Sequence, residues 1–173
     1  MAFKIPDTIT EQELFKLVDH PIVKKKAKRR MAYIVMFYQA LRVSELAKLN
    51  KEDYDENTKL LHIKQAKGSK DRKIPISPNV VKIIKHLPLT AQNTKDKGIR
   101  ALQYSLKKDG KLVLQKDLHP HTLRHSGATY YLNKKKWDIR QLQRFLGHND
   151  IKTTQIYLHV NPEDLTALMW EIE

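Results

Sequence analysis

Apolar residues recur at intervals of three and four along most of the chain, which predicts a mainly helical protein. Thr10 and Glu13 have the spacing of a capping box, and the apolar stripe after them predicts a helix that reaches about His20. The apolar run 31–38 predicts a second helix, and the basic run 24–30 is expected to form its solvated first turns. These residues supply the first two expected core helices.

Further helices are predicted from apolar stripes that carry a start or stop signal at one end. Ser44 is expected to cap a short third helix, Asp109-Gly110 to end a longer one, and Asp138 and Gly147 to bound another. The remaining stripes place helices after Ser77, at 95–108, from His121 to about Leu132, at 139–146, at 151–158 and at 162–173.

Two stretches, 59–64 and 72–77, alternate between apolar and polar residues and predict two strands. The segment between them carries Gly68 and two lysines, which indicates a hairpin turn. The expected fold class is therefore mainly α with a small antiparallel β-sheet (α+β), and the chain length suits one domain over 1–173.

Lysine and arginine outnumber Asp and Glu by 33 to 19, so the chain carries a formal net charge of +14. Such an excess predicts attraction to a polyanion, most commonly nucleic acid; the alternative is that the lysines serve solubility. The absence of Cys from the sequence excludes disulfides and thiolate metal sites. No apolar run is long enough to cross a bilayer and no signal-peptide pattern is present, so we expect a cytoplasmic protein.

The stretch around Pro120 has the features of a phosphate site. Pro120 suits a helix start, and His121 and Arg124, three residues apart, are expected to project from the same side of the first turn. Unpaired N–H groups and the positive end of the helix dipole lie at the same place, so an anion is favoured there. His119, His121 and His125 lack a nearby acidic or Cys partner, and we expect no metal or other cofactor.

Other candidate residues are ambiguous when taken singly. Arg42 and Glu45 are three apart and on their own indicate a local ion pair between two helices. Lys67 on the expected hairpin is on its own an ordinary surface lysine, and Tyr157 in an apolar stretch is on its own a core aromatic. Only the order of these residues along the chain distinguishes a catalytic role from these ordinary structural roles.

Taken together and in order, these residues resemble the catalytic domain of the tyrosine recombinase (phage integrase) family. The resemblance runs from Thr10 to the last expected helix. Its most specific parts are the motif 40–46 around Arg42, the motif 120–126 around Arg124, and Leu146-Gly147-His148 followed nine residues later by Tyr157.

The resemblance implies a site-specific recombinase or integrase that cleaves and rejoins DNA through a covalent 3′-phosphotyrosine, without metal or ATP. Tyr157 would be the nucleophile, and Arg42 and Arg124 would clamp the scissile phosphate. Lys67 would protonate the leaving 5′ oxygen, with Lys70 as the alternative acid.

The remaining site residues follow from the same resemblance. His121 would hydrogen-bond the phosphate and assist proton transfer with Tyr157, and His148 would donate to the same phosphate. Glu45 would orient the neighbouring Arg and His side chains. The further DNA contacts expected are Lys70, Arg72, Thr122, His125 and Arg144.

Some features depart from the family pattern. Ala40 and Ala66 stand where members often carry Gly, and the N-terminal clamp domain of the family is not recognised, so a catalytic domain alone is expected. The segment 162–173 is expected either to dock on its own domain or to exchange with a neighbouring protomer. The expected partners are double-stranded DNA in the nucleoid and further copies of the chain in a synaptic complex.

The sequence alone leaves two alternatives to a recombinase open. One is a type IB topoisomerase-like enzyme that relaxes DNA with the same chemistry, and the other is a basic DNA-binding module without catalysis.

Overall fold

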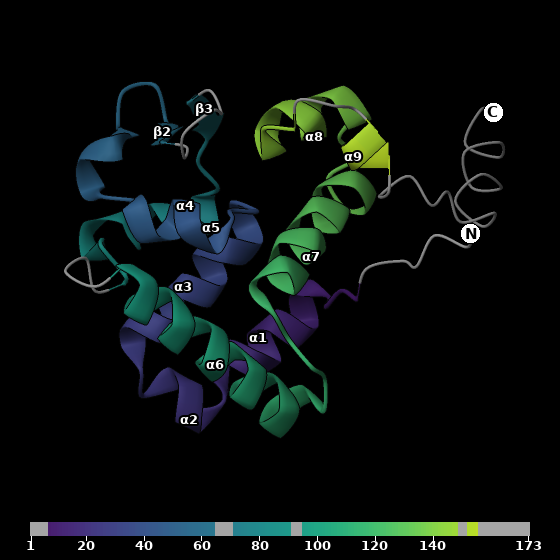
Figure 1. Cartoon of the computed structure of the whole chain (residues 1–173). Helices are drawn as coiled ribbons and strands as arrows, with labels where there is room; N and C mark the ends of the chain where they lie inside the picture. The colour runs from purple at the N-terminus through teal and green to yellow at the C-terminus, as the bar shows by residue number, and fades with distance from the viewer. Residues whose placement is uncertain (1–6, 65–70, 91–94, 149–151, 156–173) are drawn as a thin grey trace, which may run out of the picture.

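The computed structural model describes residues 7–64, 71–90, 95–148 and 152–155. Most of these residues are helical (Figure 1). In chain order the elements are α1 (Glu11–Asp19), α2 (Pro21–Lys24), α3 (Ala27–Tyr38), α4 (Val43–Lys48), a 3-10 turn at Lys51–Asp53, β1 (Tyr54–Asp55), β2 (Leu60–Ile63), β3 (Arg72–Pro75), α5 (Pro78–Val81), a 3-10 turn at Ile84–His86, α6 (Lys95–Leu114), α7 (Pro120–Asn133), α8 (Ile139–Leu146) and α9 (Lys152–Gln155).

The strands form one antiparallel sheet in the order β1-β2-β3. Leu61 of β2 pairs with Ile74 of β3, and both side chains are buried, so one face of the sheet covers the core. The two predicted strands are confirmed. The two-residue strand β1, which pairs Tyr54 with Leu61, is too short to produce an alternating pattern and was not predicted. The predicted fold class, mainly α with a small antiparallel sheet, is confirmed.

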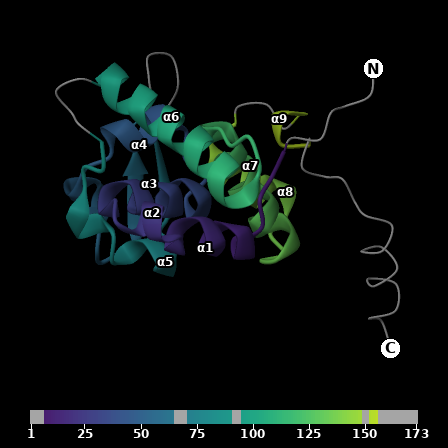
Figure 2. The same ribbon diagram turned by 90° about the horizontal axis from the view of Figure 1, so that it is seen from below.

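Helix α3 is the centre of the core, and α1, α2, α5 and α7 all contact it (Figures 1 and 2). Its residues 32–38 are buried without exception. Helix α7 approaches α3 closely at Gly127, where a Cβ atom would lie 2.0 Å from the Phe37 carbonyl oxygen. The Tyr131 hydroxyl then donates to the Tyr38 carbonyl at 2.7 Å. The helix that carries His121 and Arg124 is thereby fixed to the core.

Several predicted helix ends are confirmed. The Thr10 hydroxyl accepts from Glu13 N–H, and the Glu13 carboxylate accepts from Thr10 N–H, so α1 begins with the predicted capping box. Asp138 caps α8 with its side chain, and Gly147 ends α8 in the left-handed conformation, with φ of 67°. Pro21, which was expected either to end the first helix or to begin the next, begins α2.

The predicted start of the third helix is wrong. The cap is Arg42 rather than Ser44, because the Glu45 carboxylate accepts the Arg42 N–H at 2.8 Å and so draws the helix start back by two residues. The basic run 24–30 is also divided, since Lys24 ends α2 and α3 begins only at Ala27. After Ser77 the expected helix is short: α5 ends at Val81 and a 3-10 turn follows.

The predicted stop at Asp109-Gly110 is wrong as well, because α6 continues to Leu114. The Asp109 carboxylate is buried and accepts from the Tyr33 hydroxyl at 2.8 Å and from Arg29 at 3.2 Å. At Gly110 a Cβ atom would lie 2.5 Å from Leu118, so this glycine serves close packing rather than a helix end. The predicted helix at 162–173, and the end of the one at 151–158, lie outside the described residues.

Within these described ranges, no helix has the length and apolar character needed to span a membrane.

Candidate active site

The Glu45 carboxylate, on the first turn of α4, gathers three arginines from distant parts of the chain. Arg72 donates from Nη1 to Oε1 at 2.7 Å and from Nη2 to Oε2 at 3.2 Å. Arg42 donates to the same carboxylate from Nη1 at 3.0 Å and from its backbone N–H at 2.8 Å. Arg124 Nη1 lies 3.6 Å from Oε2. The Arg42–Glu45 pair expected from spacing is confirmed, and it is one part of a larger cluster.

Glu45 is ionised in this setting. Burial alone would raise the pKa of its carboxyl, since only 4% of the side chain is exposed. The hydrogen bonds and charge of Arg72, the Arg42 N–H and the charge of Arg124 outweigh that burial and hold the pKa below its usual value. With Glu45 ionised, the three guanidiniums leave an excess of positive charge at one place.

Arg124, in the second turn of α7, is held from behind by main-chain carbonyls. Nη1 donates to the Ala40 carbonyl at 2.7 Å, and Nη2 donates to the Leu146 carbonyl at 2.8 Å. Ala40 presents its carbonyl from a left-handed turn, with φ of 45°, at a position where family members often carry Gly. Only 4% of the Arg124 side chain is exposed, whereas 36% of the Arg42 side chain is. Arg124 therefore lies at the buried base of the cluster, and Arg42 lies at its solvent-exposed side.

His148 follows the Gly147 turn and joins the same cluster. Its Nε2 atom lies 3.1 Å from Arg124 Nη2, and its Nδ1 atom lies 3.0 Å from Thr154 Oγ1. Burial, followed by the charges of Arg124, Arg42 and Arg72, lowers the pKa of His148 to about 4. The ring is therefore neutral at pH 7. Because Nε2 faces a donor, the ring proton belongs on Nδ1, which then donates to Thr154.

His121 and His125 lie on the first two turns of α7, with ring centroids 6.2 Å apart. Burial lowers the pKa of His125 to about 4, with smaller contributions from His121 and Arg124. His121 is exposed and lines an open pocket of about 530 Å³ together with α6. Within the described part of the chain, no three His, Asp or Glu side chains are grouped in a way that could hold a metal ion.

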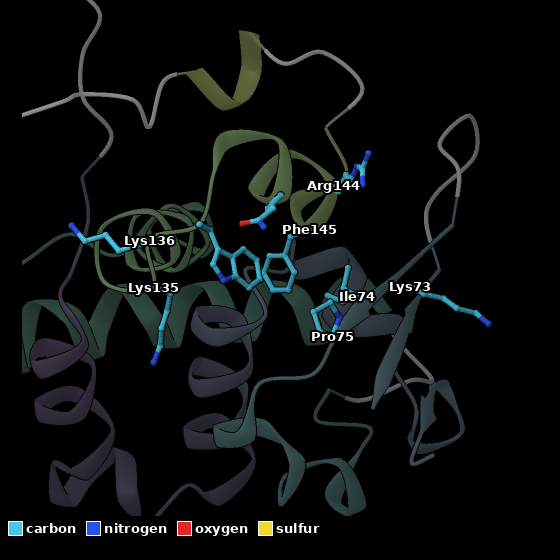
Figure 3. A pocket seen from close by; sticks show the side chains of 9 residues that line it. Lys73, Ile74, Pro75, Lys135, Lys136, Arg144 and Phe145 are labelled. Atoms are coloured by element: carbon cyan, nitrogen blue, oxygen red, sulfur yellow. The ribbon is translucent and has the colours of Figure 1, made fainter. Parts of the chain in front are cut away.

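The other predicted DNA contacts differ in exposure. Thr122 is buried, and its hydroxyl accepts the His119 N–H at 3.2 Å, which caps α7. Arg144 is exposed at the end of α8, beside Lys73 (Figure 3). The predicted residues Lys67, Lys70 and Tyr157 lie outside the described residues.

Sequence patterns did not anticipate two members of the cluster. Thr154 has no motif around it, and nothing in the sequence pairs it with His148. Arg72 was expected to contact DNA, but it is part of the Glu45 cluster. Its strand did contain a signal, because Arg72 and Ile74 are two residues apart and so share the inward face of β3.

Comparisons with known proteins agree with this geometry. The model of the phage integrase family matches residues 7–164. A tyrosine recombinase of Thermosipho africanus is 34% identical over an alignment of 171 positions that covers 93% of this chain and 60% of that protein. Tyrosine recombinase XerC of Pseudomonas fluorescens strain Pf-5 is 35% identical over an alignment of 180 positions that covers 95% of this chain and also 60% of the relative. The chain thus spans about 60% of the length of these curated relatives.

Solved structures show the same architecture. The crystal structure of XerA recombinase superposes with a TM-score of 0.78 at 26% identity, over 98% of this chain and 66% of that one. XerH site-specific recombinase bound to its difH substrate gives a TM-score of 0.69 at 22% identity, over 96% of this chain and 54% of that one. Together with the family match, which covers both the arginine cluster and the position of Tyr157, these findings show that the chain belongs to the phage integrase family.

Proposed function

We propose that this protein is a site-specific DNA recombinase that cleaves and rejoins strands through a covalent 3′-phosphotyrosine at Tyr157. The observation that supports this most is the cluster of Arg42, Arg124 and His148 around Glu45, drawn from α4, α7 and the end of α8. The curated relatives are named tyrosine recombinases, and the XerH neighbour was solved on a DNA substrate.

In the proposed reaction the Tyr157 oxygen attacks the scissile phosphorus, and a new P–O bond replaces the bond to the 5′ oxygen. His121 is proposed to assist the transfer of the proton from Tyr157 during attack, and Lys67 supplies a proton to the 5′ oxygen. The phosphotyrosine keeps the energy of the broken bond, so the reverse attack by a 5′ hydroxyl rejoins a strand without ATP.

Arg42 and Arg124 are proposed to bind the nonbridging oxygens of this phosphate. Negative charge grows on these oxygens in the transition state, and guanidiniums held in place beforehand stabilise it most. Arg124 is fixed by the Ala40 and Leu146 carbonyls, so it needs little reorganisation. Such cationic side chains supply the charge that other phosphoryl-transfer enzymes obtain from metal ions.

The two histidines are proposed to contact the same phosphate. His148 is neutral in the free protein and accepts from Arg124. A phosphate bound at Arg124 adds negative charge beside the ring, which raises the His148 pKa and favours a proton on Nε2 for donation to the phosphate. His121 is exposed on the first turn of α7, where DNA can reach it.

Double-stranded DNA is the proposed partner, and the net charge of +14 supports it. His125 and Thr122 lie on α7 and Arg144 lies on α8, and these residues are proposed to contact the DNA, together with Lys70. Arg72 instead donates to Glu45 and to the Phe145 carbonyl.

Self-association on DNA is also proposed, with 162–173 as the exchanged segment. These twelve residues carry four acidic side chains and no lysine or arginine. An open pocket of about 610 Å³ between β3 and α8 offers the opposite charge, with Lys73, Lys135, Lys136 and Arg144 around Trp137 and Phe145. In Figure 3 the labelled Lys and Arg side chains surround the apolar Ile74 and Phe145.

A trapping experiment tests the proposed function. A DNA substrate with a nick near the cleavage point loses its 5′ hydroxyl fragment after cleavage, so the phosphotyrosine cannot be reversed. We expect a covalent adduct in EDTA from the wild-type protein and none from Tyr157→Phe. Persistence of the adduct in Tyr157→Phe would exclude Tyr157 as the nucleophile. Relaxation of supercoiled plasmid without preference for a site would favour the topoisomerase-like alternative.

A further inference from the structure

We propose that Arg72 is a positioning residue that joins Glu45 to the carboxyl end of α8 and so holds the phosphate-binding arginines in place. This inference rests on the proposed function.

The guanidinium of Arg72 is used entirely within the protein. Two of its nitrogens bind the two oxygens of Glu45 in a fork, at 2.7 and 3.2 Å, and the third, Nε, donates to the Phe145 carbonyl at 3.0 Å. Only 9% of the side chain is exposed. With all three of its nitrogens bound to groups of the protein, this guanidinium is arranged to position those groups.

The turn at Gly147 is shaped around the same side chain. A Cβ atom at residue 147 would lie 2.8 Å from Arg72 Cδ and 3.0 Å from both Nε and Nη1. Arg72 therefore lies directly across the turn from which His148 emerges. A displacement of Arg72 would move the α8 terminus, and with it the Leu146 carbonyl that holds Arg124.

Arg72 also balances the charge of Glu45. If the Arg72 charge were absent, the buried carboxylate would be neutralised only by Arg42 and Arg124, and both would be drawn toward it. With Arg72 bound to both Glu45 oxygens, the guanidiniums of Arg42 and Arg124 remain able to bind a phosphate. Lysine cannot replace this arrangement, because a single ammonium cannot span both carboxylate oxygens and the Phe145 carbonyl.

The test compares Arg72→Met and Arg72→Lys with Lys82→Met, a matched control that removes one positive charge from an exposed position at the end of α5. Single-turnover adduct formation is measured at saturating nicked DNA, and DNA affinity is measured separately. We expect both Arg72 variants to slow adduct formation by about 10- to 100-fold with little loss of affinity. Lys82→Met should cleave at the wild-type rate. Wild-type cleavage by Arg72→Lys, or a loss confined to affinity in either Arg72 variant, would overturn the proposal.

A second measurement needs no catalysis. The His148 ring is titrated by NMR in the free protein, with its signal assigned from a His148→Gln variant. We expect the His148 pKa to rise in Arg72→Met and to stay near 4 in Lys82→Met, since Arg72 is one of the charges that lower it. An unchanged His148 pKa in folded Arg72→Met would contradict the proposed position of Arg72. If wild-type protein forms no adduct, the proposed function fails, whereas this titration still decides the role of Arg72. Should Arg72→Met not fold, Arg72→Lys decides the kinetic test.

Discussion

Arg124 Nη2 lies 3.1 Å from His148 Nε2, so the buried guanidinium and the neutral imidazole form a donor–acceptor pair. Protonation of the ring would place two cationic donors against each other in a buried site. The pKa of His148 is therefore about 4, and that of the neighbouring His125 is also about 4.

This pairing predicts a loss of stability in acid. Both histidines bind a proton more readily when unfolded, near pH 6.5, than when folded, so the free energy of unfolding falls as pH drops from about 6.5 toward 4. Urea unfolding at pH 7.5 and 4.5 measures the fall. The fall should be smaller in the double variant His125→Gln/His148→Gln, and an equal fall in both proteins would contradict the assigned pKa values.

Replacing either phosphate-binding arginine is expected to block chemistry. Arg42→Ala and Arg124→Ala should each slow adduct formation at saturating DNA by about 100-fold or more, by comparison with the loss of an oxyanion donor. Arg124→Ala should also lower the free energy of unfolding, since the buried Ala40 and Leu146 carbonyls lose their donor, whereas Arg42→Ala should affect it less. Near-normal cleavage by either variant would show that the proposed clamp is misplaced.

Tyr33 is expected to contribute to stability without contributing to catalysis. Its hydroxyl donates to the buried Asp109 carboxylate, so Tyr33→Phe should lower the free energy of unfolding by about 1.5–3 kcal/mol. Tyr104→Phe is the matched control, because that ring is 72% exposed. Urea unfolding of both variants checks the prediction, and equal stabilities would contradict it. The cleavage rate of folded Tyr33→Phe should equal that of the wild type.

Gly147 is expected to tolerate no side chain. Gly147→Ala combines a left-handed φ of 67° with a collision against Arg72, and should cost about 1–2 kcal/mol or more from the backbone conformation alone. Gly147→Asn is the comparison, because Asn adopts this conformation more easily but keeps the Cβ atom. Thermal unfolding should rank the proteins as wild type, then Asn, then Ala. A Gly147→Asn variant with wild-type stability would show that the Arg72 contact costs nothing.

The proposed docking of 162–173 predicts a charge-swap result. Lys135→Glu/Lys136→Glu should reduce the amount of protein multimer formed on DNA, as measured by crosslinking. Adding Glu171→Lys/Glu173→Lys in the same chain should restore part of it, because opposite charges face each other again. Multimers that are unaffected by the first pair would place the segment elsewhere.

Local patterns predicted the features whose partners are close in sequence. The Thr10 capping box, the Gly147 helix end and the Arg42–Glu45 pair each involve residues within four positions, and all are present. The length of α6 was mispredicted because Asp109 is stabilised by Tyr33, which is 76 positions away. The local sequence around Asp109 gives no indication of such a distant donor.

The candidate site was predictable to a similar extent. The order of motifs identified the family and most of the residues around Glu45. The bond between Arg72 and Glu45 spans 27 positions, and the contact between His148 and Thr154 has no motif, so only the fold reveals them.

The Glu45 carboxylate has two structural roles, so the arginine cluster depends on the folding of α4. The same oxygens that accept the Arg42 N–H and begin α4 also collect the guanidiniums. A nascent or partly melted chain in which α4 has not formed cannot present those cations as a set. The proposed cleavage of DNA therefore requires the completed fold.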